Sequence, residues 1–500
     1  MDDSKPKNPS LKSTNNPSSQ VWDFASAPFL HPMKVTVNVN EPGTAPGLIF
    51  VAPYTLYGTP MIGQTGTLIM DQEGNPVWFR PLDNYTQNRN FRLQSYFGHP
   101  VLTLWQGTIS GSQSAHPPLP MGDPLPGAHF QIINQNYQVI KTITAQMGYT
   151  AGVHEFVITK RNTALFAAVK PVPADLSPYG GPVDGYIDNY AIQEIDLVTG
   201  KLVFFWDTLS HVDPADSMVS ISSATFSNGI WDCFHMNSVE DGPDNTVLIS
   251  MRDMGAIYKI DKATGKIIWQ LGGKQTDFTF GPAATFSWQH DARFRPGERI
   301  SLFDNSCCAS SDSPPEGPAR GLILQLDYQN MTAKVDRTYY HDPLLTVSHR
   351  GNLQDLPGGN QFVGWGARPF LSEFKNAGNT KEHPSVNFIY DMQFPGSNFS
   401  YRAFKNEWVG LPLYPPSIAV NPVGHDSANV HASWNGSTET VAWQVLAGPT
   451  PNTLSVVVCK TPHTGFETAI HVDSVGPYFQ VHALNSKCEI IGRSWISCGY

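Results

Sequence analysis

Hydrophobic and polar positions along this chain repeat at a regular interval. The pattern is a hydrophobic strand, a tight turn and a second hydrophobic strand, and its clearest turn reads Ile-Asp-x-x-Thr-Gly-Lys at residues 195–201 and 260–266. Met70–Trp78 is a third copy, and weaker copies contain Ile133-Asn134, Leu326-Asp327 and Tyr390-Asp391. The polar anchors of the six copies lie 62 to 66 residues apart, at positions 71, 134, 196, 261, 327 and 391. Each copy predicts a β-hairpin.

A second hairpin is predicted between successive anchors. It consists of two hydrophobic strands joined by a turn, at residues 91–105, 154–169, 235–251, 290–303 and 352–365. Two hairpins in each interval make a unit of four strands, and six such units predict a six-bladed β-propeller over residues 28–413. Closing the ring requires one blade with strands from both ends of this region. Residues 47–53 are a candidate for that blade, but the sequence leaves the closing segment open.

The two ends of the chain differ from this repeat. After about Leu413 come short alternating strands, for example at 430–434, 440–445, 455–459 and 478–483, which predict a small immunoglobulin- or fibronectin-type β-sandwich over residues 414–500. Cys459 and Cys488 are candidates for a disulfide there, although sequence does not establish the pairing. Residues 1–27 are interpreted as a disordered leader, and the polar first 20 residues lack the apolar stretch of a signal peptide.

Composition supports an all-β chain and excludes some functions. Of the 500 residues, 42 are Gly and 41 are Pro, which favours short strands joined by turns, and the hydrophobic fraction of 40% argues against disorder. The net charge of −10, without a long basic run, argues against nucleic acid as a partner. No apolar run is long enough to span a membrane. Sequons favour a secreted glycoprotein over a cytoplasmic protein, and they lie at Asn84, Asn330, Asn398 and Asn435.

Histidines mark the first strand of several predicted inner hairpins: His154, His235, His290 and, close to the fifth, His349. Because the innermost strands of a propeller line its central channel, we expect these side chains to converge. Arg252 ends the strand after His235 and is expected to return to the same mouth. The histidines lack the close spacing of metal ligands, so we expect no metal. Arginine and imidazole groups can instead bind a sulfuryl or phosphoryl group while one neutral imidazole attacks it.

Aromatic and amide side chains near these histidines predict a site for a small aromatic substrate. The candidate aromatic wall consists of Trp105, Phe234, Trp288 and Trp365. Asn237 and Asn352 are the candidate hydrogen-bonding groups.

Two longer motifs carry a resemblance to a known family. They are Asp-x-Phe-His-x-Asn-Ser-Val at 232–239 and Trp-Gln-His-Asp-Ala-Arg-Phe at 288–294, joined by His-Glu-Phe at 154–156, Arg252, and the stretches 354–359, 401–404 and 433–437. With these motifs, residues 28–500 resemble the fungal-type branch of the aryl sulfotransferase family. The resemblance implies a six-bladed propeller that moves a sulfuryl group between phenols without a nucleotide sulfate donor or other cofactor.

The resemblance also implies a role for each matching residue. His290 would be the nucleophile that becomes a sulfohistidine, which gives ping-pong kinetics. His235 and Arg252 would hold the sulfuryl oxygens and the developing phenolate, and His154 would hydrogen-bond the phenol oxygen or shuttle its proton. The chain departs from the family pattern at Ile249–Asp253, where Asp253 beside Arg252 could reduce the availability of the guanidinium for an anion.

Two other functions remain open from the sequence. The same histidines could serve as acid and base in a lyase, isomerase or cyclase that acts on a natural-product-like small molecule. Alternatively, the propeller could bind an aromatic ligand or a protein without catalysis.

Overall fold

The chain folds almost entirely into β-strands. The computed structural model describes residues 20–499, with the exception of 57–58, 84–85, 110–125, 223–225, 228–229, 308–316, 424–425 and 475. In these residues the helical segments with named bounds are three short 3₁₀ turns, Ser177–Tyr179, Pro214–Asp216 and Pro357–Gly359. None of the described helices has the length and apolar character needed to cross a membrane.

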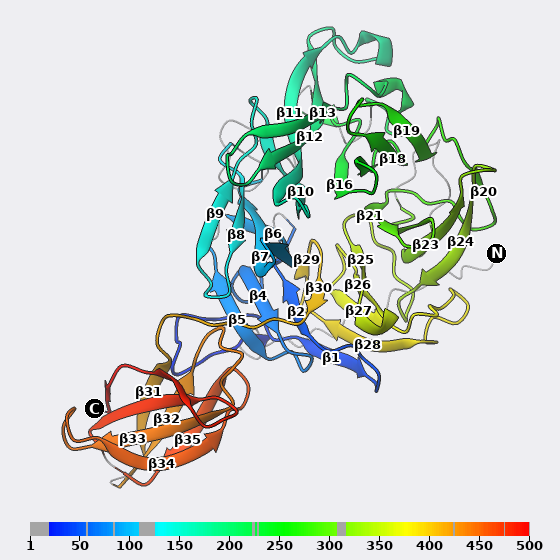
Figure 1. Cartoon of the computed structure of the whole chain (residues 1–500). Helices are drawn as coiled ribbons and strands as arrows, with labels where there is room; N and C mark the ends of the chain where they lie inside the picture. The colour runs from blue at the N-terminus through cyan, green and yellow to red at the C-terminus, as the bar shows by residue number, and fades with distance from the viewer. Residues whose placement is uncertain are drawn as a thin grey trace.

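Six sheets lie around a common centre (Figure 1). Three of them are formed by consecutive antiparallel strands. The first contains β6 (Gln87–Tyr96), β7 (His99–Gly107), β8 (His129–Ile133) and β9 (Val139–Ile143). The second contains β10 (Thr150–Ile158), β11 (Thr163–Ala174), β12 (Gly185–Asp196) and β13 (Leu202–Asp207), with β14 (Phe226–Ser227) and β15 (Ile230–Trp231) at its side. The third contains β16 (Met236–Asp241), β17 (Thr246–Met251), β18 (Ala256–Asp261) and β19 (Ile267–Gly272).

Of the other three sheets, the fourth is again formed by consecutive strands, whereas the fifth and sixth include a strand from the other end of the region. The fourth contains β21 (His290–Arg295), β22 (Arg299–Asp304), β23 (Arg320–Asp327) and β24 (Thr332–Tyr339), with β20 (Thr279–Phe280). The fifth contains β25 (Asn352–Asp355), β26 (Gln361–Gly364), β27 (Phe370–Phe374) and β28 (Phe388–Gln393), with β1 (Thr36–Asn40) at its edge. The sixth joins β30 (Phe404–Asn406) to β2 (Leu48–Val51), β4 (Gly66–Met70) and β5 (Pro76–Pro81).

Strands from the two ends of this region pair with each other in the fifth and sixth sheets. β30 pairs with β2 in the sixth sheet, and β1 pairs with β28 in the fifth. The short pair β3 (Pro53–Tyr54) and β29 (Phe399–Ser400) adds a further contact between the two ends. Strands β6, β10, β16, β21, β25 and β30 are the innermost of their sheets (Figure 1).

The repeated turn motif works through its polar anchor. The carboxylates of Asp196 and Asp261 accept the backbone N–H groups of Thr199 and Thr264, at 2.6 and 2.8 Å. The glycine that follows has a φ of 72° in both turns, a conformation that costs glycine little. The anchors at 71, 134 and 327 likewise accept backbone N–H groups in their own turns.

The sixth anchor was predicted wrongly. Asp391 lies inside β28, and the connection between β27 and β28 is the segment 375–387. No glycine turn follows the Tyr-Asp pair, so the pair continues the strand. Its buried carboxylate accepts hydrogen bonds from Ser372 and Asn38, both at 2.8 Å. A similar dipeptide therefore has a different role when the turn residues are missing.

The residues after 413 form two further sheets, which lie to one side of the other six (Figure 1). One contains β31 (Ser417–Val423), β32 (Ser427–Ser433) and β35 (Glu467–Val472). The other contains β33 (Ala442–Gly448), β34 (Ser455–Pro462), β36 (Tyr478–Leu484), β37 (Ile490–Arg493) and β38 (Ser497–Cys498). Cys459 and Cys488 are free thiols, so the disulfide considered for this region is not formed.

The predicted leader is only partly tested. Residues 1–19 lie outside the described part of the chain, whereas residues 20–27 are placed and packed. The Phe24 ring lies 4.3 Å from the ring of Phe466, and the backbone N–H of Ser26 donates to Glu467 at 2.6 Å. Residues 24 and 26, which lie within the predicted leader, therefore pack against the C-terminal region.

Two of the four sequons are poorly placed to carry a glycan on the folded chain. Asn398 is fully buried, and its amide donates to the Ile62 carbonyl at 2.8 Å. Asn435 both accepts from and donates to the backbone of Phe79 at 2.8 Å. Asn330 is exposed in a turn, and Asn84 lies outside the described residues.

Candidate active site

The structure brings together the histidines predicted to converge. His154 lies within β10, His235 directly precedes β16, and His290 is the first residue of β21. The His154 and His235 rings are 4.9 Å apart, and His290 lies close enough that, after burial and His235, it further lowers the pKa of His154. Arg252 directly follows β17, and its backbone N–H donates to the His235 carbonyl at 3.0 Å, which brings this arginine back to the mouth of the same strand pair.

Irregular backbone at the inner ends of the sheets directs these side chains. The pairings of β6, β10, β16 and β21 with their neighbours each shift register close to the site. Such shifts bend a strand and turn side chains to a new direction. The left-handed residues here, with φ between 49° and 69°, are Asn90, His235, Trp288, Asp291 and Arg350. Each such conformation costs about 1–3 kcal/mol, and such strain clusters at functional sites.

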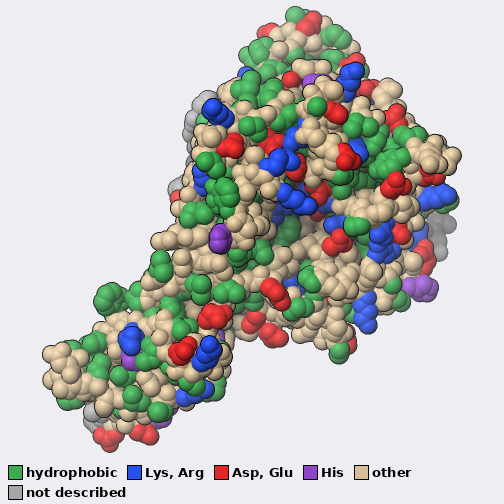
Figure 2. Space-filling model, viewed as in Figure 1, with side chains coloured by type: hydrophobic (Ala, Val, Ile, Leu, Met, Phe, Trp, Pro, Cys, Tyr) green, Lys and Arg blue, Asp and Glu red, His purple; other side chains and the backbone are tan. Residues whose placement is uncertain are grey.

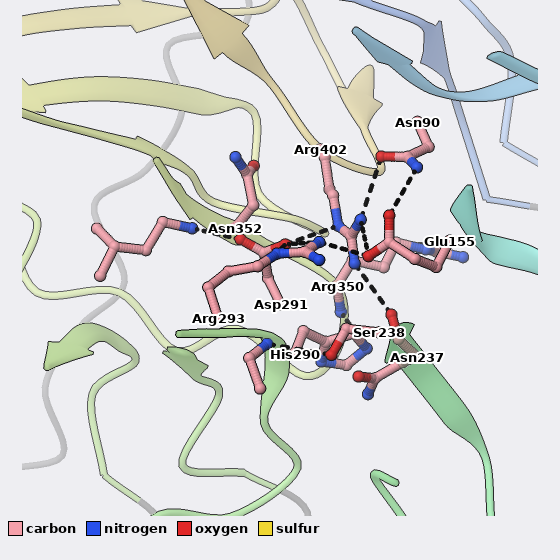
Figure 3. Close-up of polar contacts among 12 residues, drawn as sticks. Asn90, Glu155, Asn237, Ser238, His290, Asp291, Arg293, Arg350, Asn352 and Arg402 are labelled. Atoms are coloured by element: carbon pink, nitrogen blue, oxygen red, sulfur yellow. Dashed lines mark hydrogen bonds and ion pairs between the residues drawn. The ribbon is translucent and has the colours of Figure 1, made fainter. Parts of the chain in front are cut away.

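His290 is held as a neutral imidazole in one tautomer. Its Nδ1–H donates to Asn305 Oδ1 at 2.8 Å and to the Trp288 carbonyl at 3.0 Å. The Asn305 amide donates to two backbone carbonyls, so its oxygen must face the ring. Burial first, and then the charge of Arg252, hold the pKa of His290 well below 6.5. The lone pair therefore lies on Nε2, where it accepts the backbone N–H of Arg350 at 3.1 Å (Figure 3).

His235 is oriented by a carboxylate instead. Asp232 accepts the His235 backbone N–H at 3.1 Å and also contacts Nδ1 of the ring. This contact places the proton on Nδ1 and leaves the Nε2 lone pair for a substrate. The His235 side chain is 18% exposed, whereas His290 is 1% exposed, so His235 is the more accessible of the two rings.

Arg252 forms an ion pair with its neighbour, as the sequence suggested. Its Nε and Nη2 donate to the two oxygens of Asp253 at 2.5 and 3.1 Å. Burial opposes the charge of Arg252, but Asp253 outweighs burial and raises the pKa of the guanidinium. Asp232, His235 and Asp253 also place ligand atoms within 4.8 Å of one another. A cation at that point would compete with the Arg252 guanidinium for Asp253.

His154 completes the group from the second sheet. Its side chain is 8% exposed, and its Nδ1 has no hydrogen-bond partner within the described residues. The ring lies 5.6 Å from the ring of Tyr401. Burial, followed by the charges of His235 and His290, keeps the pKa of His154 well below 6.5. His154 is therefore a neutral group with an unused polar atom beside the other histidines.

A charged cluster behind the histidines connects most of the innermost segments (Figure 3). Glu155 is fully buried and contacts Arg92 at 3.0 Å, Arg402 at 3.0 Å and Arg293 more closely. Asp291 contacts Arg293 at 2.6 Å and Arg402 at 3.5 Å. The sequence does not predict this cluster, because its members come from different sheets. A charged residue directly after two of the candidate histidines, at 155 and 291, was the available signal.

The predicted substrate-binding residues divide into two groups. Trp288 is 9% exposed, and its ring lies 5.9 Å from the Arg252 guanidinium. The rings of Trp105, Phe234 and Trp365 are instead fully buried in hydrophobic clusters, and both indole N–H groups have protein acceptors. These three rings stabilise the sheets, and we do not assign them to substrate. Alternation along a strand predicts burial but does not distinguish the core from a site wall.

The two predicted amides also link segments to one another. Asn237 donates to the Gln289 carbonyl at 2.7 Å. Asn352 donates to the Ala403 carbonyl at 2.8 Å and accepts the Ala403 N–H at 2.9 Å. Their described hydrogen bonds therefore hold neighbouring inner segments together, so we do not assign the amides to substrate.

Comparison with known proteins adds one decisive match. The model of the family described as arylsulfotransferase (ASST) matches residues 127–383, which is more than half of the chain and includes all the histidines discussed above. The chain belongs to the arylsulfotransferase family. Membership of this family supports the prediction that the chain is an enzyme of the arylsulfotransferase type.

The remaining comparisons add little. No curated protein matches the chain. A Bacteroides caccae protein of unknown function matches with 10% identity and a TM-score of 0.38 over 69% of this chain and 94% of that one. A periplasmic gluconolactonase from Pseudomonas aeruginosa matches with 11% identity and a TM-score of 0.34 over 70% and 99%. These scores are too low to support an argument about function.

Proposed function

We propose that this chain transfers a sulfuryl group from an aryl sulfate to a phenol through a sulfohistidine at His290. The observation that carries the proposal is the meeting of His154, His235, His290 and Arg252 beside one partly exposed mouth. Family membership gives the reaction class, and the fixed neutral tautomer of His290 suits a nucleophile. We interpret the six sheets as blades of a six-bladed propeller over residues 28–413, with a sandwich over 414–500, as in the fungal-type branch.

In the first half-reaction, Nε2 of His290 attacks sulfur and the bond from sulfur to the aryl oxygen breaks. The Arg350 N–H must first leave the Nε2 lone pair. Negative charge develops on the departing phenol oxygen, where the partly exposed His235 and Arg252 would stabilise it, and a protonated His235 can return a proton to that oxygen. In the second half-reaction an acceptor phenol loses its proton to His235 or His154, attacks sulfur and breaks the S–N bond.

The test is to trap the intermediate. The protein is mixed with 4-nitrophenyl sulfate without an acceptor, and its intact mass and peptide masses are measured. We expect one sulfuryl group per chain on the peptide that contains His290, no adduct in His290→Ala, and a normal adduct in the exposed control His383→Ala. Absence of the adduct in the wild type, or its persistence in His290→Ala, would refute the assignment.

A second function is favoured by the hydrogen bond that occupies His290. Because the His290 lone pair accepts the Arg350 N–H, the Asp232–His235 pair is the more available base. This arrangement suits proton transfer in a lyase, isomerase or cyclase. This second function predicts no sulfuryl adduct on any histidine. It also predicts that the protein converts a small aromatic substrate, and that this activity is lost in His235→Ala and retained in His383→Ala.

A further inference from the structure

Two arginines beside the histidines, the buried Arg89 and the partly exposed Arg350, have no acidic partner among the described residues. Arg89 is 4% exposed, its Nη2 contacts the Gln87 amide oxygen, and its Nη1 has no hydrogen-bond partner among the residues that the structure describes. Arg350 donates from its side chain to Nε2 of His349 at 2.8 Å. Neither arginine forms a described ion pair, whereas Arg252 is paired with a carboxylate. Burial first, and then the nearby charge of Arg350, lower the pKa of Arg89.

Aromatic rings enclose this pair of cations. The Arg89 guanidinium lies 3.1 Å from the ring centroid of Tyr54, and the Arg350 guanidinium lies 5.4 Å from the same ring. Arg350 also lies 5.0 Å from the ring of Phe399. The hydroxyl groups of Tyr54 and Tyr401 are buried and have no hydrogen-bond partner in the described part of the chain. Three donors, namely one guanidinium N–H and two hydroxyl groups, are thus unsatisfied in one small region.

This arrangement is unfavourable without a ligand. Burial of a cation without a counter-ion lowers the stability of the folded protein. Burial of a hydroxyl group without a hydrogen-bond partner has the same effect. The nearby His349 does not relieve the charge. It is a neutral ring, because burial, followed by the charge of Arg350, lowers its pKa to about 2. An anion with several acceptor oxygens would satisfy these donors.

We propose that Arg89, Arg350 and the hydroxyl groups of Tyr54 and Tyr401 bind an oxyanion carried on the aromatic ring of the substrate. The group is a carboxylate or a second sulfate, so the preferred substrates are acidic phenols and their sulfates. Arg350 connects this subsite to the chemistry, because its backbone N–H contacts His290 while its guanidinium faces the aromatic rings. The substrate class rests on the proposed function, although binding of the anion does not require turnover.

The test is a binding experiment without catalysis. Benzoate, phenyl sulfate, neutral benzamide and inorganic sulfate are titrated into the full chain by calorimetry. For the wild type we expect benzoate or phenyl sulfate to bind at least about tenfold more tightly than benzamide, since one charge-assisted hydrogen bond contributes about this much. Arg89→Gln and Arg350→Gln should each remove this preference. The control Arg299→Gln, in an arginine that pairs with Asp336 on the surface, should retain it.

Three results would overturn the proposal. The first is equal binding of benzoate, phenyl sulfate and benzamide, and the second is a preference that survives both substitutions. The third is binding of inorganic sulfate as tight as that of the two ring compounds, which would assign the subsite to the transferred group. If the titrations confirm the anion preference but the mass measurement finds no sulfuryl adduct, the anion subsite is confirmed and the proposed sulfuryl transfer is refuted.

Thermal melting separates the subsite from a purely structural role. Removal of a buried cation that has no counter-ion also removes the free-energy cost of taking its charge out of water. Arg89→Met should therefore melt at or above the wild-type temperature in the absence of ligand. It should also lose the upward shift that benzoate causes in the wild type. A fall in the melting temperature of Arg89→Met would show that the guanidinium stabilises the protein without a bound anion. That result would contradict the proposal that Arg89 binds an anion.

Discussion

Replacement of Glu155 by glutamine tests whether the buried charged cluster stabilises the ring of sheets. Glu155 is fully buried and contacts Arg92, Arg293 and Arg402. Glutamine keeps the shape of the side chain but removes its charge, so Asp291 is left as the remaining carboxylate that contacts Arg293 and Arg402. Loss of one partner from a buried ion pair costs about 3–5 kcal/mol. We expect Glu155→Gln to lower the free energy of unfolding by about this amount at pH 7.

The pH dependence of the same variant supplies a second readout. Burial alone would raise the pKa of Glu155, but Arg293, Arg402 and Arg92 outweigh burial and hold it well below 4.5. A carboxyl group whose pKa is lowered by folding stabilises the folded state above its unfolded pKa, and this contribution is lost as pH falls towards the folded pKa. The difference between the wild type and Glu155→Gln should therefore be largest above about pH 4.5 and should shrink at lower pH.

Urea unfolding followed by tryptophan fluorescence measures both effects. Glu382→Gln is the matched control, because Glu382 is 61% exposed and its ion pair with Lys381 has an N–O distance of 3.9 Å. An exposed pair contributes at most about 1 kcal/mol. A loss in Glu155→Gln no larger than that of the control, or a loss that is independent of pH, would refute the reasoning. The arginines would then be solvated or paired in another way.

Three further predictions follow from the site and from the C-terminal region. Asp232→Asn should lower kcat by about 10²- to 10⁴-fold with a smaller change in KM, because the His235 tautomer is no longer fixed. Equal kcat values for the wild type and the variant in steady-state assays would contradict this role of Asp232. His154 and His290 have lowered pKa values and stay neutral, so neither ring should contribute an acid limb to kcat/KM at pH 6.5, although stability should decline below 6.5 as these two histidines take up protons in the unfolded chain. A loss of kcat/KM near pH 6.5 that follows the titration of either ring by NMR would contradict this prediction. Asn435→Ala removes two hydrogen bonds to β5 and should lower the stability of this region by about 1–3 kcal/mol. Limited proteolysis near residue 435 should then be faster than in the exposed control Asn452→Ala, and equal cleavage rates would refute this prediction.

Local sequence patterns predicted the strands and hairpins well, because the relevant interactions lie within a few residues. The side chains of Asp196 and Asp261 cap turns only three residues ahead, so the motif contains the whole hydrogen-bond pattern. The same kind of inference failed at Asp391, where the turn residues are absent. Alternation also identified buried positions such as Trp105 and Trp365, but it does not indicate whether a buried ring faces the core or a site.

What the sequence determined by itself was the repeat, the strand pairs and the histidine motifs that connect the chain to its family. Only the tertiary structure decided which groups contact one another across sheets. It paired Glu155 with three arginines, placed the Arg350 N–H on His290, and left Arg89 without an acidic partner in the described residues. The physical reason is distance along the chain. Turns and strands depend on neighbouring residues, whereas the charge balance of a site depends on side chains brought together from segments hundreds of residues apart.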